Sequence, residues 1–179
     1  MPNLPPLVIT RKDELGEPFE TPFRQVELWA NTPLAIGRCW RNAAFTVPAN
    51  AFTWIPFDTQ SFVRGVCRFV STPAGNTGIQ VPYTGYYQVN GEWRVTNTNA
   101  AANVAAIISH NGSGILSVGI QANFAANAFQ AVVVSDIVYL IAKDVVNLIA
   151  YNATAAAPQA LQVADGAASN YLSVSLLGP

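Results

Sequence analysis

The second half of this 179-residue chain carries almost no charge, and this feature limits the structures that it can form. From Val95 to Pro179 the only charged side chains are those of Asp136, Lys143, Asp144 and Asp165. Charged residues make up 11% of the whole chain, whereas an ordinary soluble domain carries about 25%. A segment with so few charges leaves apolar surface that the core of one copy cannot hide. A membrane, aggregation or obligate assembly must cover it.

Obligate assembly is the explanation that the sequence favours. A membrane-spanning helix needs about 20 consecutive apolar residues, and the longest apolar runs, such as 131–134, are broken by Ser, Asp, Asn or Lys. The first residues, MPNLPP, have neither the basic start nor the apolar stretch of a secretory signal. We therefore expect no membrane partner, and we expect the chain to associate with copies of itself.

Charge and cysteine content argue against two further classes of protein. The net charge of −1 and the pI near 5.7 argue against a nucleic-acid partner, because binding to phosphates needs clustered Lys and Arg. Cys39 and Cys67 lack the spacing of a metal site and are too few for a disulfide scaffold. We expect both thiols to be reduced, buried and inert, since free Cys packs like a small hydrophobe.

Residues 1–44 differ in character from the rest, and we interpret them as an extended N-terminal arm. Prolines recur along this segment, and each removes a backbone donor and biases its predecessor toward extended geometry: Pro2, Pro5, Pro6, Pro18, Pro22 and Pro33. The alternative is a disordered tail. We favour an arm that docks onto a partner or neighbouring subunit, because it offers apolar anchors at Leu7, Ile9, Phe19, Phe23 and Trp29.

Residues 45–179 have the pattern of an all-β domain. Short runs rich in Val, Ile, Tyr, Phe and Trp alternate with clusters of Gly, Asn, Pro and Thr. The many Ala residues are interleaved with Asn and β-branched residues, which weaken a helix. The sequence Asn111-Gly112 predicts a tight hairpin turn. The pattern predicts strands at 45–47, 52–57, 66–69, 85–95, 104–109, 115–122, 129–141, 145–152 and 171–177.

The pair Asn90-Gly91 admits two interpretations, a hairpin turn or the middle of one strand. We favour the continuous strand, because side chains alternate along a strand and the separation of faces is then clean, with one face formed by Tyr87, Val89, Gly91, Trp93 and Val95. In 145–152 both faces are mostly apolar. Such a strand is covered twice, and another subunit can supply the second cover.

Three segments resemble the jelly-roll domains of complement globular heads and tumour necrosis factors. VPYTGYYQV at 81–89 is similar to the P-x-x-G-x-Y entry into a central strand of that family. IVYLIAKDVVNL at 137–148 resembles its L-x-x-G-D-x-V-x-L hairpin, with Lys143 where Gly is usual. YLSVSLLG at 171–178 resembles its last strand, F-S-x-x-L-L. The resemblance covers about residues 45 to 178.

The resemblance implies a jelly-roll sandwich that packs as a three-fold trimer, with residues of the inner sheet lining the axis. On this basis the expected contacts between subunits are Tyr86, Tyr151 and Tyr171, although each also suits an ordinary core position. Such domains also occur in phage decoration proteins, head fibres and tail-fibre tips. The Lys-poor composition, rich in Ala, Asn, Thr and Val, looks more like those proteins than like animal ligands.

Residues that could carry chemistry are few, and we expect no enzyme, no cofactor and no metal. His110 is the only histidine and lies beside a predicted turn; a catalytic triad would also need a marked nucleophile and an acid. The side chains of Asp136, Asp144 and Asp165 lack the spacing of a calcium loop. A glycosidase needs two paired carboxylates, and no spacing of these residues and Glu92 pairs them convincingly.

Two functions remain. The first is a trimeric capsid decoration or head-fibre protein on the virion surface, assembled in the host cytoplasm, whose arm binds the major capsid protein or another virion protein. The second is a receptor-binding module at a tail tip, which recognises host carbohydrate or protein through the loops at 72–79, 110–114 and 152–170. Few aromatic residues lie in those loops, which weakens the second hypothesis.

Overall fold

The computed structural model describes residues 35–43, 45–65, 67–71, 75–96, 104–112, 114–121, 129–153, 159–161 and 170–178. All of them belong to one compact unit, Leu34–Pro179. The five anchors predicted for the N-terminal arm (Leu7, Ile9, Phe19, Phe23 and Trp29) lie outside the described residues, so their docking role stays a prediction.

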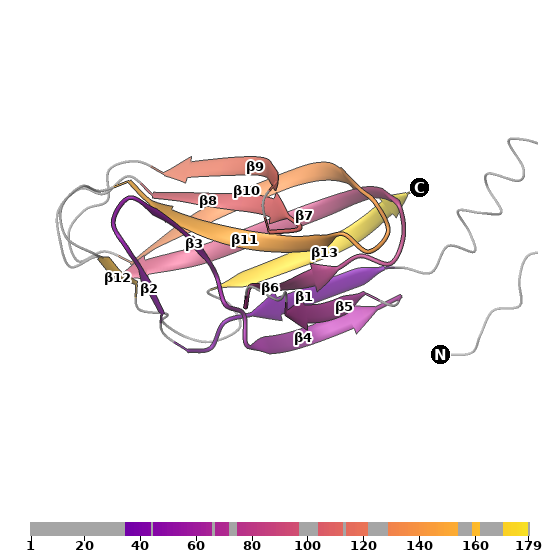
Figure 1. Cartoon of the computed structure of the whole chain (residues 1–179), viewed down its shortest axis with the longest axis horizontal. Helices are drawn as coiled ribbons and strands as arrows, with labels where there is room; N and C mark the ends of the chain where they lie inside the picture. The colour runs from indigo at the N-terminus through magenta and orange to yellow at the C-terminus, as the bar shows by residue number, and fades with distance from the viewer. Residues whose placement is uncertain are drawn as a thin grey trace, which may run out of the picture. The chain divides into compact units, whose positions relative to one another are not determined.

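Two antiparallel sheets form a sandwich (Figure 1). The five-stranded sheet has the order β10 (Phe129–Leu140), β7 (Gly85–Thr96), β13 (Tyr171–Gly178), β1 (Ile36–Trp40), β4 (Thr59–Arg64). The six-stranded sheet has the order β5 (Arg68–Ser71), β6 (Thr77–Gln80), β11 (Val145–Asn152), β8 (Val104–His110), β9 (Gly114–Gln121), and β3 (Ala51–Trp54) also pairs with β11. β2 (Phe45–Val47) pairs with β12 (Gln159–Leu161).

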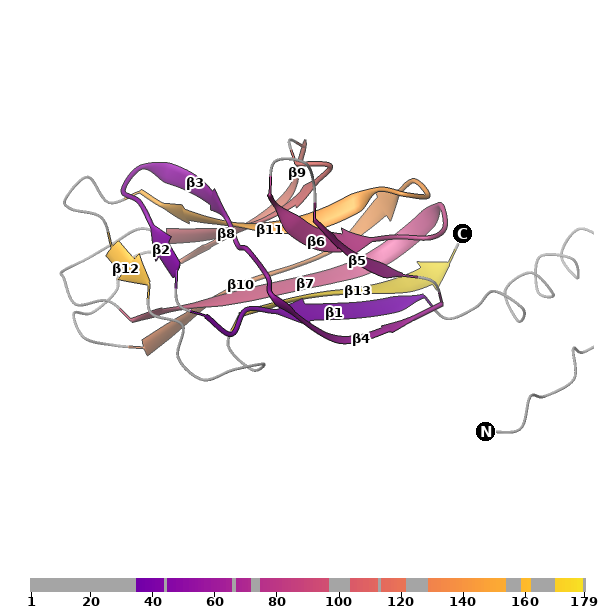
Figure 2. The same cartoon turned by 60° about the horizontal axis from the view of Figure 1, so that its bottom comes forward.

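The core fills the space between the two sheets, which Figure 2 shows as two layers. Trp93 and Tyr87 are the largest fully buried side chains. Each places its polar atom on a carbonyl: Trp93 Nε1 donates to Ala105 O at 3.2 Å, and Tyr87 Oη donates to Tyr83 O at 2.9 Å. These bonds offset the cost of burying an indole N–H and a phenol. The Trp93 bond also joins β7 to β8 of the opposite sheet.

β7 runs without a break through Asn90-Gly91, which confirms the continuous strand. Tyr87, Val89, Gly91 and Trp93 face the core and are buried, whereas the residues between them face outward. Gly91 is required at its position for a steric reason: a Cβ there would lie 2.5 Å from Leu148 Cδ1 of the opposite sheet. The Asn-Gly signal for a hairpin is therefore overruled by packing across the sandwich.

Four strands were not predicted: β1, β4, β6 and β12. β1 also lies within the segment interpreted as the arm, yet it pairs with β13 on one side and β4 on the other. The predicted domain boundary after residue 44 is therefore too late, because residues 36–40 belong to the sandwich. Alternation in β1 is hard to recognise, since its core-facing residues are Gly37 and Cys39 and its outward ones include Arg38.

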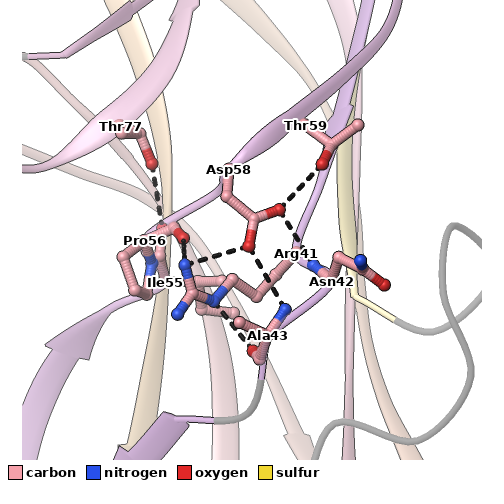
Figure 3. A network of polar contacts seen from close by, with 8 residues as sticks. All are labelled: Arg41, Asn42, Ala43, Ile55, Pro56, Asp58, Thr59 and Thr77. Carbon is pink, nitrogen blue, oxygen red and sulfur yellow. Dashed lines mark hydrogen bonds and ion pairs between the residues drawn. The ribbon is translucent and has the colours of Figure 1, made fainter.

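A polar network holds the chain after β1 against the segment before β4 (Figure 3). The Arg41 guanidinium lies 3.1 Å from Asp58 Oδ2 and donates to Pro56 O at 2.8 Å. Burial alone would raise the pKa of Asp58, but hydrogen bonds to its carboxylate and the charge of Arg41 outweigh burial and lower it. The carboxylate accepts bonds from Asn42 N (3.0 Å), Thr59 Oγ1 (2.9 Å) and Ala43 N (3.2 Å).

Several turns among the described residues use backbone conformations with positive φ, and two of them lie at positions that the sequence singled out. Asn111 (φ 52°) and Gly112 (φ 76°) connect β8 to β9, which confirms the predicted hairpin turn. Lys143 has φ 79° in the turn between β10 and β11. The turn therefore keeps the left-handed conformation that suits Gly, even though this sequence supplies Lys.

Replacing Lys143 with Gly is expected to stabilise the fold by about 0.5–1 kcal/mol. The left-handed conformation costs an L-residue about 1–2 kcal/mol, and Gly removes this cost. The greater conformational freedom of Gly in the unfolded chain offsets part of the resulting stabilisation. The exposed Lys143 side chain makes no hydrogen bond or ion pair with the described residues that would be lost. Urea unfolding measures the difference, with Lys143→Ala as the control, since Ala keeps the strain. Equal stability of the Gly and Ala variants would contradict the prediction.

Candidate self-association surface

The outer face of β10 and β7 carries a row of exposed apolar side chains. β10 is apolar on both faces, because Val132, Val134, Val138 and Leu140 point into the core while other apolar residues alternate with them and point outward. We call the outward set the apolar ridge: Val133 (52% exposed), Ile137 (55%), Tyr139 (55%) and Tyr86 (53%). Tyr86 and Tyr139 are partners across the strands, with ring centroids 5.2 Å apart in an edge-to-face contact.

A shallow groove of about 350 Å³ lies across the β13, β1 and β4 side of the same sheet. The Arg38 side chain lies over the Tyr171 ring, with its guanidinium carbon 4.4 Å from the ring centroid. Arg38 pairs in register with Phe62 of the edge strand β4, whose side chain is 44% exposed. The lining residues are Ile36, Arg38, Phe62, Tyr171, Ser173, Val174 and Ser175.

Three polar side chains lie within this face and bond to one another; we call them the polar triad (Gln88, Asn90 and Ser135). Gln88 Nε2 donates to Ser135 Oγ at 2.9 Å and to Asn90 Oδ1 at 3.3 Å. Ser135 Oγ donates to Asn90 Oδ1 at 2.7 Å. Ser135 lies on the outward face of β10 between Val133 and Ile137, so the triad reaches into the apolar ridge.

The structure places two of the three tyrosines predicted as subunit contacts on the same sheet, at opposite ends of β13. Tyr86 belongs to the apolar ridge, and Tyr171 lines the groove on the same sheet. Tyr151 lies on β11 of the other sheet, where its ring stacks on Phe52 at 4.5 Å. The three tyrosines therefore do not form one surface. Ile137 and Tyr139 were not predicted as contacts, although the apolar residues on both faces of 129–141 were a signal.

The acidic residues and the histidine considered as chemical groups make local hydrogen bonds, and Asp144 holds a turn in place. Asp144 Oδ1 accepts from Asn111 Nδ2 at 2.8 Å and its Oδ2 from Ile141 N at 2.9 Å. His110 Nδ1 lies 3.3 Å from Asn111 Nδ2, and Asp136 Oδ1 accepts from the adjacent Ile137 N. Asp165 lies outside the described residues. The part of the chain that the structure describes contains no group of three His, Cys, Asp or Glu residues placed to hold a metal.

The two cysteines are free and buried, as predicted. Burial raises the pKa of the Cys67 thiol to about 11 and raises the pKa of Cys39 further. Both are therefore thiols rather than nucleophilic thiolates at neutral pH.

In the described residues no helix is long and apolar enough to cross a bilayer.

Comparison with known proteins identifies the fold. No protein-family pattern and no curated sequence matches the chain. Among solved structures, Eiger TNF from S. frugiperda is 13% identical with a TM-score of 0.58, and the match covers 82% of this chain and 94% of that one. The chain has a tumour-necrosis-factor-like jelly-roll fold. Murine APRIL at pH 5.0 is 14% identical with a TM-score of 0.56, and the match covers 80% of this chain and 99% of that one.

This TNF-like fold confirms the jelly-roll sandwich predicted from the three motifs. Gly85 of the first motif begins β7, the second motif forms the β10–β11 hairpin, and the third motif is β13. At 12–14% identity the likeness concerns the fold. The function of the chain therefore has to be argued from its own surface.

Proposed function

We propose that this chain is a non-enzymatic structural subunit that associates with copies of itself, three in a closed ring, through the outer face of the five-stranded sheet. The apolar ridge carries this proposal. Four large apolar side chains, each more than half exposed, lie together on one face of a chain that is poor in charge. Contiguous exposed apolar surface of this kind marks an interaction site.

The ridge and the groove occupy different parts of the same sheet, which suits a ring. The ridge lies on β10 and β7, and the groove lies across β13, β1 and β4. When one copy places its ridge over the groove of the next, each copy uses both surfaces and the ring closes without free ends. A stable interface buries on the order of 1,600 Å² in total, and its apolar part contributes about 25 cal/mol per Å².

We also propose that the assembly decorates a virus capsid or forms a head fibre, with the N-terminal arm as the anchor. The low charge and the Lys-poor composition rich in Ala, Asn, Thr and Val, which looks like that of phage decoration and fibre proteins, support this role. The arm supplies apolar anchors at Leu7, Ile9, Phe19, Phe23 and Trp29. Binding of the arm to a capsid protein would hold the assembly on the virion surface.

Deleting residues 1–33 is expected to abolish capsid binding without changing the number of copies in the assembly. The deletion must end there, because removing β1 (Ile36–Trp40) would take a strand from the sheet. Cosedimentation with capsids of the virus that encodes this chain measures binding, and light scattering after gel filtration measures the copy number. A truncated protein that still binds capsids would remove the arm from the proposal, and immunogold labelling of intact particles would show whether the protein lies there.

A second candidate function is a receptor-binding module, which an aromatic cluster on the other sheet favours. Phe52 is 53% exposed and stacks on Tyr151 with an interplanar angle of 23°. Trp54 lies on the same strand as Phe52, and it packs with Tyr151 against one small buried cluster. Its buried Nε1 donates to no group among the described residues. Exposed rings of this kind can stack on a sugar. Binding to host cells that is lost in Phe52→Ala, with no binding to capsids, would favour this function over the first.

A further inference from the structure

The polar triad interrupts a surface that otherwise offers apolar contacts. Ser135 interrupts the ridge between Val133 and Ile137. It is held by Asn90 and Gln88 of β7, and Gln88 Nε2 also donates to the backbone carbonyl of Asp136 at 3.2 Å. These bonds fix the orientation of both amide groups. The outward sides of the amides are the part of the triad that a second copy would meet.

Two hydrogen-bonding groups of the triad stay unused. Asn90 Oδ1 accepts two bonds, but no acceptor among the described residues receives a bond from Asn90 Nδ2. Gln88 Nε2 donates its bonds, and within the same described part nothing donates to Gln88 Oε1. The surface therefore presents a free donor and a free acceptor two residues apart on one strand. The hydroxyl groups of Ser173 and Ser175 in the groove of the next copy can both donate and accept, so they can satisfy both groups.

Covering the ridge removes water from these groups, and the cost then depends on how the copies meet. A buried donor or acceptor without a partner costs about 1–3 kcal/mol. Apolar contact is not directional, so the ridge alone would tolerate a second copy shifted by two residues along the strand, since this shift keeps the same face outward. The triad would not tolerate this shift, because the shift would place an unpaired amide group against an apolar side chain.

We propose that Gln88, Asn90 and Ser135 fix the number of copies and their register in the assembly, by hydrogen bonding to the groove of the next copy, where Ser173 and Ser175 present hydroxyl groups. The proposal rests on the self-association proposed above. A single buried Asn fixes register and copy number in helical coiled coils, at a cost in stability. The polar triad acts in the same way on the face of a β-sheet.

The test compares the full-length protein with an apolar variant, Gln88→Leu/Asn90→Leu/Ser135→Ala, by native mass spectrometry and sedimentation velocity. We expect one copy number for the natural protein. The apolar variant should associate roughly tenfold more tightly, since replacing a buried polar group by an apolar one of similar volume is often stabilising. It should also populate two or more copy numbers. In the single variant Asn90→Leu, affinity and copy number should change in the same direction. This variant keeps the test valid if the triple variant misfolds.

The matched control is Asn42→Leu, which adds the same apolar side chain at an exposed position in the connection after β1. This control should keep the natural copy number. If both apolar variants also keep a single, natural copy number, the role of the triad is refuted while self-association stands. If the natural protein is itself a monomer, the proposed function fails and this inference fails with it.

Discussion

Ile137→Asp is expected to convert the assembled protein into a monomer, with association weakened by at least about a hundredfold. Ile137 lies in the apolar ridge, between Ser135 and Tyr139 on the outward face of β10. A carboxylate there loses its water when the groove of the next copy covers it, and Arg38 of that groove already lies over the Tyr171 ring. An uncompensated buried charge costs about 3–5 kcal/mol, and about 1.4 kcal/mol corresponds to a factor of ten in association.

The control for this substitution is Ile115→Asp, because the two side chains are similarly exposed, 58% against 55%. Ile115 lies on β9 of the six-stranded sheet, so the same charge is added outside the ridge and the groove. Light scattering and sedimentation over a range of protein concentrations report the copy number of each variant. Association that survives Ile137→Asp, or that is lost equally in Ile115→Asp, would place the interface elsewhere.

Trp93→Ala is expected to destabilise the folded chain by about 3–5 kcal/mol, the range for large aromatic residues in a core. Trp93 is fully buried in the middle of β7, and its Nε1 bond to Ala105 O joins the two sheets. Removing the ring leaves a cavity and also leaves Ala105 O without that donor. Since domains are stable by only about 5–15 kcal/mol, this substitution removes a large share of the total.

Urea unfolding at a fixed protein concentration measures this loss, because association adds concentration-dependent stability. Trp93→Phe separates the two contributions, since it keeps much of the ring volume and lacks the indole N–H. We expect it to lie between the natural protein and Trp93→Ala. A loss below about 1 kcal/mol for Trp93→Ala, which is ordinary for a surface substitution, would show that the sandwich does not depend on this residue.

The sequence by itself determined the fold class and the faces of several strands. The order of core and outward residues in β7 follows from strict alternation, and it outweighed the Asn90-Gly91 turn signal. Asn111-Gly112 determined the β8–β9 turn, because both residues tolerate positive φ. These features depend on residues close together in the chain. Local patterns can therefore reveal them without knowledge of the partners across the sandwich.

Only the tertiary structure decided which residues share a surface. Tyr86, Tyr151 and Tyr171 look alike in sequence, but the strand order places Tyr151 on the other sheet. The pairing of β1 between β13 and β4 joins residues far apart in the chain and creates the groove around Arg38. Sheet neighbours are set by long-range hydrogen bonds and by packing of the core, and no short segment encodes them. The tertiary structure also reveals the apolar ridge, because it shows that one face of β10 packs in the core and the other face is exposed.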